Sequence, residues 1–467
     1  MNLAFEVEDA FSTGGVLSRA TEQFVPRSGQ TEMALAVTHA IEEGHALVVE
    51  ASTGVGKTFS YLVPALLSGE RILLSTATKA LQDQLFGRDL PRLIEALELP
   101  VRTALLKGRS SYLCLHRMEM ARQEAHLPEG VSVRSLARVE QWSQVTRTGD
   151  LAELPGLDER SPIIPLVTST RDNCLGSQCP RFRSCHVNQA RREAMAADVV
   201  VINHHLFFAD LAVRDSGVAE LLPSVRIAIF DEAHQLNETG VQFLGDSLTT
   251  GQLLDFSRDL LAAGLQLARG LADWQEVVGA TEQSARELRL CTRNNPPGTK
   301  LRWTGEVPEG LLAVVWQQAL KAVHASCVHA CAALYTVSEI APDFVRLHER
   351  ATRLAERVAC FLDVCEPGCV RWVDVGVQLR LVESPLDISS AVKSKMLGTS
   401  GGGAKTWIFT SATLGYDEKL SWFTQPCGLE EAEVLRIGSP FDYERQAALY
   451  VPANFPKPGD PAHSERV

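Results

Sequence analysis

Short apolar runs alternate with longer amphipathic stretches in the first part of this 467-residue chain. The runs at 46–50 and from Ile72 are apolar and short, as buried strands are. After each of them apolar residues recur every three or four positions, which is typical of a helix that packs on one face. Strands that alternate with helices in this way predict a doubly wound α/β lobe.

Two long segments interrupt this alternation. The first, 107–197, is rich in turns and cysteines, and the second, 237–405, carries amphipathic helical patterns such as GQLLDFSRDLLAAGLQLARGLADW. In the second segment WVDVGVQLRLVES alternates like a hairpin strand. Apolar strands return in 198–236 and 406–467. We therefore predict one lobe in three parts with two inserted domains, which agrees with the three or so domains that the length suggests.

Composition and charge restrict the class of protein. The chain has no apolar run near the roughly 18 residues of a membrane helix, and its acidic N-terminus does not resemble a secretory signal. We therefore expect a cytoplasmic protein in which the 11 cysteines stay reduced. The formal net charge of −12 argues against a surface coated with nucleic acid. The segment 107–192 nevertheless has 13 Lys and Arg against 9 Asp and Glu, which leaves a local basic track possible.

A phosphate-binding loop follows the first predicted strand. The sequence ASTGVGKT stands between an apolar strand and a helical pattern, which is the context that such a loop requires. The glycines let backbone N–H groups approach phosphates, Lys57 adds a positive charge, and Thr58 offers a hydroxyl to Mg²⁺. The predicted nucleotide-binding residues are Arg27, Gln30, Ser52, Thr53, Gly54, Val55, Gly56, Lys57 and Thr58.

A second apolar strand ends in the box Asp-Glu-Ala-His. Asp231 would lie at the carboxyl end of this strand and hold Mg²⁺, and Glu232 would polarise the attacking water. With Lys57 and His234 these two acids form the predicted catalytic set. Arg27 and Gln30 precede the phosphate loop in FVPRSGQ, and WIFTSATL places Ser411, Ala412 and Thr413 after a further strand.

Four cysteines suggest a metal centre. The stretch NCLGSQCPRFRSC has the spacing C-x4-C-x5-C, and Cys114 lies upstream of it. Four thiolates suit an iron–sulfur cluster or zinc, and the residues alone do not separate the two. A second group, Cys360, Cys365 and Cys369, lacks a fourth cysteine nearby. Since Cys327 and Cys331 lie at helical spacing in an apolar run, we expect them in the core and expect no metal there.

Together these motifs resemble the XPD/DinG group of superfamily-two DNA helicases. The resemblance covers nearly the whole chain through PRxxQ, ASTGVGKT, STATKALQDQL, LLKGRSSYLC, NCLGSQCP, VVVINHHLF, FDEAHQL, WIFTSATL and SPFDY. It implies an ATP-driven helicase with a RecA-like motor lobe that moves 5′→3′ on single-stranded or forked DNA during repair or replication. It also implies that 107–197 is a [4Fe–4S] domain, that 237–405 is a mainly helical arch, and that the cluster ligands are Cys114, Cys174, Cys179 and Cys185.

The resemblance also implies which residues meet DNA. The strand would thread between the cluster domain and the arch, and residues 411–413 would couple the ATP site to it. Tyr112 or Phe182 could stack on bases, although core packing is at least as good an explanation for either. The DNA-contacting residues expected in this way are Thr76, Thr78, Gln82, Lys107, Arg109, Arg181 and Arg183.

The sequence after Thr413 is short. Only 54 residues follow it, whereas the family continues with a second RecA-like lobe that supplies arginine fingers worth about 10³ to 10⁵ in rate. We therefore expect an incomplete fragment that hydrolyses ATP poorly by itself. A non-catalytic half-motor that binds ATP or DNA without turnover is the alternative. A nuclease, as in some relatives, would need an N-terminal exonuclease domain for which the start of the chain has no space.

Overall fold

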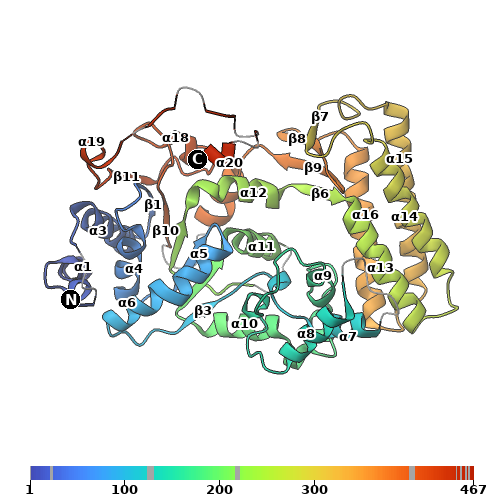
Figure 1. Ribbon diagram of the computed structural model, residues 1–467, viewed down its shortest axis with the longest axis horizontal. Helices are drawn as coiled ribbons and strands as arrows, with labels where there is room; N and C mark the ends of the chain where they lie inside the picture. The colour runs from blue at the N-terminus through green and yellow to red at the C-terminus, as the bar shows by residue number, and fades with distance from the viewer. Residues whose placement is uncertain are drawn as a thin grey trace.

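The structure is a computed structural model that describes residues 2–20, 25–123, 131–215, 221–398, 405–448, 450–452, 455–457, 460 and 463–466. Within these ranges no helix is long and apolar enough to cross a membrane. Figure 1 shows a lobe built on a central sheet, a cysteine-bearing domain beside it, and a helical bundle at the far end.

A seven-stranded sheet forms the centre of the lobe, and all of its paired strands are parallel. Its order is β11-β1-β10-β5-β2-β4-β3. The strands are β1 (Ala46–Ala51), β2 (Ile72–Thr76), β3 (Thr103–Leu105), β4 (Val199–Asn203), β5 (Ile227–Asp231), β10 (Thr406–Ser411) and β11 (Glu433–Ile437). The predicted α/β lobe is confirmed, and it includes strands from all three of the predicted parts.

Helices cover both faces of this sheet because its strands are apolar on both sides. In β1, Leu47 and Val49 belong to one buried cluster and Val48 to the other. The first face packs against α1 (Leu3–Phe11), α3 (Ser28–Glu43), α4 (Lys57–Leu67) and α6 (Leu90–Ala96). The second packs against α10 (His186–Ala196), α11 (His204–Asp215) and α12 (Leu236–Leu244). Shorter elements of the lobe are α2 (Val16–Ala20), α5 (Lys79–Gln84), α17 (Ser389–Val392), α18 (Ser421–Thr424), α19 (Tyr443–Gln446) and α20 (His463–Arg466).

The first insertion is a small domain with a core of its own. Its helices are α7 (Leu115–Gln123), α8 (Val133–Ser143) and α9 (Ile164–Val167), followed by single 3₁₀ turns at Gly176–Gln178 and Phe182–Ser184. Among its described residues, which leave out 124–130, ten form a buried cluster, including Leu113, Leu136 and Val167. So small a core stabilises a domain weakly, and such domains usually depend on a metal or another cross-link.

The second insertion is an arch with four long helices and an antiparallel sheet. The helices are α13 (Thr250–Leu267), α14 (Trp274–Leu290), α15 (Ala313–Tyr335) and α16 (Pro342–Leu362). The sheet has the order β6-β9-β8-β7, with β6 (Asp246–Thr249), β7 (Thr299–Trp303), β8 (Cys369–Val375) and β9 (Leu379–Pro385). The predicted hairpin is β8–β9. Cys327 is fully buried in α15 and Cys331 packs beside it, so both are core residues as predicted.

The boundaries of the arch differ from the predicted 237–405. The arch core runs from Leu248 to Leu381. Helix α12 and the residues Ile388, Val392 and Met396 instead pack with the strands of the lobe. The helical patterns on either side of the boundary look alike in sequence, because both are amphipathic. What separates them is the partner that their apolar face covers.

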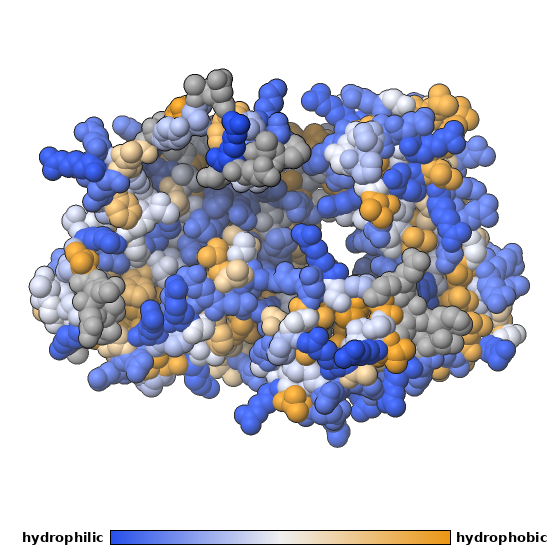
Figure 2. All heavy atoms as spheres, in the orientation of Figure 1, coloured by the Kyte–Doolittle hydropathy of each residue, from blue (hydrophilic) through white to orange (hydrophobic). Residues whose placement is uncertain are grey.

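The three parts enclose an opening. Figure 2 shows this hole through the molecule, between the lobe and the arch and next to the cysteine domain. Strands β6 and β9 join the arch to the lobe on one side, since Ser384 donates to the carbonyl of Val241 in α12 over 2.8 Å. Side chains of the cysteine domain and the arch close the other side, as described below.

Candidate nucleotide and cluster sites

The phosphate loop lies at the carboxyl end of β1 and leads directly into α4, which begins at Lys57. Gly54 and Gly56 have φ angles of 90° and 94°, in the left-handed region that favours glycine. The Nζ atom of Lys57 donates to the carbonyl of Ala51 over 3.2 Å and so lies across the loop. With the first N–H groups of α4, this arrangement is a ready-made anion site.

The segment before α3 is in contact with the loop, as the motif Arg-x-x-Gln suggested. A guanidinium N–H of Arg27 donates to the carbonyl of Gly54, and the amide of Gln30 donates to that of Gly56 over 3.2 Å. A Cβ atom on Gly56 would lie 2.3 Å from the amide nitrogen of Gln30, which would have to move, and the φ of 94° would strain any other residue at this position. Next to the loop, Arg27, Gln30 and Thr58 line a cavity of about 360 Å³.

The Asp-Glu-Ala-His box follows β5 at the same edge of the sheet. Asp231 is buried and accepts a hydrogen bond of 3.0 Å from the hydroxyl of Tyr61 in α4. Burial, and then the charge of Glu232, raise the pKa of Asp231 to about 6, and Lys57 acts in the opposite direction. Glu232 has a left-handed backbone with φ of 54°, a conformation that residues other than glycine rarely adopt. Strain of this kind is often found at functional sites.

Strand β10 lies beside β5 and ends at Ser411, which begins the predicted coupling segment 411–413. The buried hydroxyl of Ser411 donates to Oε2 of Glu232 over 3.0 Å and lies 2.8 Å from Nδ1 of His234. Strand β10 lies between β1 and β5, so Ser411 stands between the phosphate loop and the acids. Ala412 and the exposed Thr413 continue the turn outward. One hydroxyl thus joins two of the predicted motifs.

His204 is a buried residue of the site that the sequence analysis did not single out. Its Nδ1 atom lies 2.8 Å from the hydroxyl of Ser75 in β2, and its ring is fully buried at the start of α11. Burial is the main reason that its pKa falls to about 4, so the ring is neutral at neutral pH. Its presence in VVVINHHLF was visible in the sequence, but two adjacent histidines do not reveal which one is buried.

Two of the three predicted DNA contacts in β2 and α5 are wrong. Thr76 and Gln82 are fully buried. The amide of Gln82 donates to the carbonyls of Leu106 and Val201 over 2.9 and 3.3 Å, so it ties α5 to the sheet. Thr78 is exposed, and its hydroxyl accepts from the N–H of Leu81 as the N-cap of α5. Of the three, only Thr78 is placed so that it could meet a ligand.

The four predicted metal ligands are grouped in the cysteine domain. The charges of Cys174, Cys179 and Cys185 all act on Cys114, whose pKa rises to about 11 mainly because of burial. Arg109 donates to Sγ of Cys174 over 3.0 Å, and Arg191 also lies in the field of Cys174 and Cys185. Although these residues are all described, no three of the four sulfur atoms fall within 4.8 Å of one another.

Basic residues in the cysteine domain differ in what they contact. Lys107 is buried between Asp83 and Asp150, and its Nζ atom lies 2.7 Å from a carboxylate oxygen of each. The prediction that it contacts DNA phosphates is therefore wrong. Arg109 is directed at a cysteine sulfur rather than outward. Arg181 is half-exposed and paired with Glu119, and Arg183 is exposed. Tyr112 is buried, so it cannot stack on a base, whereas Phe182 has 37% of its surface exposed.

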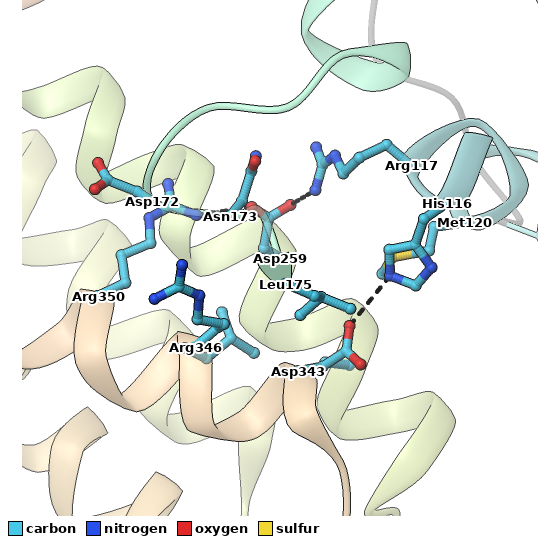
Figure 3. A pocket seen from close by; sticks show the side chains of 12 residues that line it. His116, Arg117, Met120, Asp172, Asn173, Leu175, Asp259, Asp343, Arg346 and Arg350 are labelled. Carbon is cyan, nitrogen blue, oxygen red and sulfur yellow. Dashed lines mark hydrogen bonds and ion pairs between the residues drawn. The ribbon is translucent and has the colours of Figure 1, made fainter. Parts of the chain in front are cut away.

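Ion pairs join the cysteine domain to the arch, and Figure 3 shows this contact. Asp259 of α13 lies 2.8 Å from Arg117 and 2.7 Å from Arg350 of α16. These two cations hold the pKa of the partly buried Asp259 below its usual value despite the opposing effect of burial. The guanidinium of Arg346 donates to the carbonyl of Cys174 over 2.8 Å. A cysteine of the metal group is therefore in direct contact with the arch.

Comparisons with known proteins identify relatives of this chain. The DEAD/DEAH box helicase family matches residues 31–128. The ATP-dependent DNA helicase YoaA of Escherichia coli K12 is 40% identical over 98% of this chain and 71% of its own length, and YoaA of Haemophilus influenzae is 37% identical over 98% and 70%. The ATP-dependent helicase DinG of Mycobacterium tuberculosis H37Rv is 31% identical over 93% and 67%. A solved XPD helicase structure aligns with 88% of this chain and 62% of its own at a TM-score of 0.47 and 14% identity.

The parallel sheet, its phosphate loop and the Asp-Glu-Ala-His box define a DEAD/DEAH-type P-loop motor. At the identity and coverage found, the chain belongs to the YoaA/DinG family of ATP-dependent DNA helicases.

Proposed function

We propose that the chain is the ATP-binding part of a 5′→3′ DNA helicase that carries a [4Fe–4S] cluster and acts on single-stranded or forked DNA in repair or replication. The observation that supports this most is the hydroxyl of Ser411, which bridges Glu232 and His234. Through it, a change at the phosphate end of the sheet reaches a turn that ends at the exposed Thr413. A motor needs such a link between nucleotide and track.

The residues around the phosphate loop have separate roles in this proposal. The loop and Lys57 bind the phosphates, while Thr58 and Asp231 hold Mg²⁺. Asp231 is buried at the carboxyl end of β5, where a bound cation would offset the cost of keeping its carboxylate charged. Glu232 orients the attacking water, and Ser411 fixes the carboxylate of Glu232 in the direction that this requires. Arg27 and Gln30 hold the carbonyl side of the loop, so that its N–H groups face the phosphates.

The four cysteines fit a cluster better than a single zinc ion. Thiolates around one zinc, at 2.3 Å each, would lie about 3.8 Å apart, whereas no three of these four sulfur atoms lie within 4.8 Å of one another. Cys114, Cys174, Cys179 and Cys185 would hold the cluster, which supplies a rigid cross-link to a domain with a small core. Arg109 and Arg191 offset part of its negative charge.

We propose that one DNA strand passes through the opening between lobe, cysteine domain and arch. The contact around Asp259 closes this opening on the side of the cysteine domain. A forked duplex with a 5′ or a 3′ single-stranded tail tests the polarity. The gene product that contains this chain should unwind the duplex with the 5′ tail in the presence of ATP and Mg²⁺. Preference for the 3′ tail would refute the proposed direction.

Replacing Arg181 and Arg183 together with alanine should weaken single-strand binding and flatten its salt dependence. Each lost phosphate contact lowers the salt slope by about 0.7 for single strands. Arg183 is exposed, and Arg181 pairs with Glu119 at the surface, so both can reach phosphates. Binding titrations at several salt concentrations measure the slope.

A matched control for this variant is Arg122→Ala. Arg122 lies in the same domain and is paired with Glu140 at the surface, with 71% of its side chain exposed. It should leave the slope unchanged. If the double variant retains its iron and binds with the slope of the unmodified protein, the two arginines do not contact the strand.

A further inference from the structure

A second group of thiols and carboxylates lies in the arch, at the corner where α16 leads into β8. The residues 366–369 form a tight turn in which the N–H of Cys369 donates to the carbonyl of Glu366 over 3.0 Å. Gly368 has a φ of 87°, and a proline precedes it, as in type II turns. The turn brings the side chains of Glu366 and Cys369 to the same place.

The sheet of the arch adds a third group to this corner. In the antiparallel pair β8–β9, Arg371 lies opposite Glu383 and Cys369 opposite Pro385. Side chains two residues apart in a strand share a face, so Glu383 faces the corner from the neighbouring strand. Ligand atoms of Glu366, Cys369 and Glu383 all lie within 4.8 Å of one another.

A further thiol lies nearby, although its sulfur atom is not within 4.8 Å of all three of these ligand atoms. The Sγ atom of Cys365 lies 3.5 Å from the carbonyl oxygen of Cys369 and 3.7 Å from that of Glu366. Two thiols with three residues between them, and two carboxylates, are a donor set that zinc accepts in tetrahedral sites. We propose that Cys365, Glu366, Cys369 and Glu383 bind zinc or a similar thiophilic divalent cation.

The charges around the corner are compatible with a cation. Four ionised ligands carry four negative charges. A divalent ion and the guanidinium of Arg371 together offset three of them, which leaves a net charge of minus one. The guanidinium of Arg371 pairs with Oε2 of Glu383 and donates to the carbonyls of Asp363 and Cys360 over 2.6 and 2.7 Å. The ion pair therefore engages one carboxylate oxygen of Glu383. Binding of the ion would release the thiol protons of both cysteines, as metal binding to thiols does.

The ion would fasten two layers of the arch to each other. Cys365 and Glu366 follow the C-terminus of α16, Cys369 begins β8, and Glu383 lies in β9. Helix α16 also carries Arg346 and Arg350, which contact the cysteine domain. The corner thus follows the C-terminal end of α16, whereas the residues of α16 that close the opening lie in its N-terminal half. The proposed site does not depend on the helicase activity.

Metal analysis of cluster-loaded protein tests this site. After incubation with zinc chloride and removal of excess metal, the unmodified protein should retain about one zinc per chain in addition to its iron. Cys369→Ser should lose this zinc and keep its iron. Glu366 is exposed, so Glu366→Gln should fold normally and lose zinc more readily to a chromogenic chelator. Cys291→Ser, a half-buried cysteine of the same domain, should match the unmodified protein in both metals.

Several outcomes would overturn the proposal. Unmodified protein that retains no zinc would do so, as would Cys369→Ser and Glu366→Gln variants that hold zinc as tightly as the unmodified protein. Zinc that appears only in proportion to missing iron would belong to the four cysteines of the cluster instead. If Cys369→Ser does not fold, Glu366→Gln decides alone, because its side chain lies at the surface.

Discussion

Glu232→Gln is expected to lower ATP hydrolysis about 10²- to 10⁴-fold, the range that a positioned acid or base contributes, while ATP binding persists. The amide has nearly the shape of the carboxylate and can still contact Ser411, but it cannot accept a proton from water. The phosphate loop is on a different strand and is not altered. Steady-state hydrolysis and binding of a fluorescent ATP analogue measure the two effects in the gene product that contains this chain.

Two further variants make this result specific. Lys57→Ala should abolish both binding and hydrolysis, because Lys57 belongs to the phosphate cradle itself. Glu238→Gln changes an exposed glutamate of α12, four residues after His234, and should leave ATP binding and hydrolysis unchanged. Equal hydrolysis by Glu232→Gln and Glu238→Gln would show that Glu232 does not orient the water.

Cys179→Ser is expected to remove the cluster and to loosen the cysteine domain. A [4Fe–4S] cluster needs its four ligands. The buried cluster of ten described residues is too small to keep the domain well folded without a cross-link. Iron analysis and visible absorption measure the loss of the cluster. Limited proteolysis should then cut within 107–197, while ATP binding at the distant phosphate loop remains.

Cys291→Ser is the matched control for this variant and should keep its iron, its colour and its resistance to protease. A colourless unmodified protein, prepared without oxygen, whose zinc content falls on Cys179→Ser would show that the four cysteines hold zinc. Unchanged iron in Cys179→Ser would remove this cysteine from the ligand set.

The sequence predicted site residues best where a particular residue type is needed for one specific physical reason. Gly56 has a left-handed φ of 94° that favours glycine, and the four cysteines predicted as metal ligands from their spacing are grouped in one domain. It was least informative about side-chain partners. Lys107 and Gln82 look like surface residues in the sequence, yet one is neutralised by Asp83 and Asp150 and the other bonds to two strands. Those partners come from elsewhere in the chain.

The same limit explains the elements that were missed. Strands β6 and β7 are short, and only their pairing with β9 and β8 makes them strands. Strand β11 extends the main sheet beside β1, although its sequence EVLRI alternates only weakly. The carboxylates of the proposed zinc site were overlooked because Glu383 lies on the strand next to that of Cys369, and a search by cysteine spacing does not include carboxylates.

The most direct test of the account is the rate of ATP hydrolysis with and without single-stranded DNA. It should be measured on the cluster-loaded gene product that contains this chain, with its Lys57→Ala variant as background. We expect single-stranded DNA to stimulate hydrolysis, and Ser411→Ala to reduce this stimulation more than it reduces the basal rate. Hydrolysis at the background level in both conditions, with ATP and DNA still bound, would contradict the account and identify a non-catalytic half-motor.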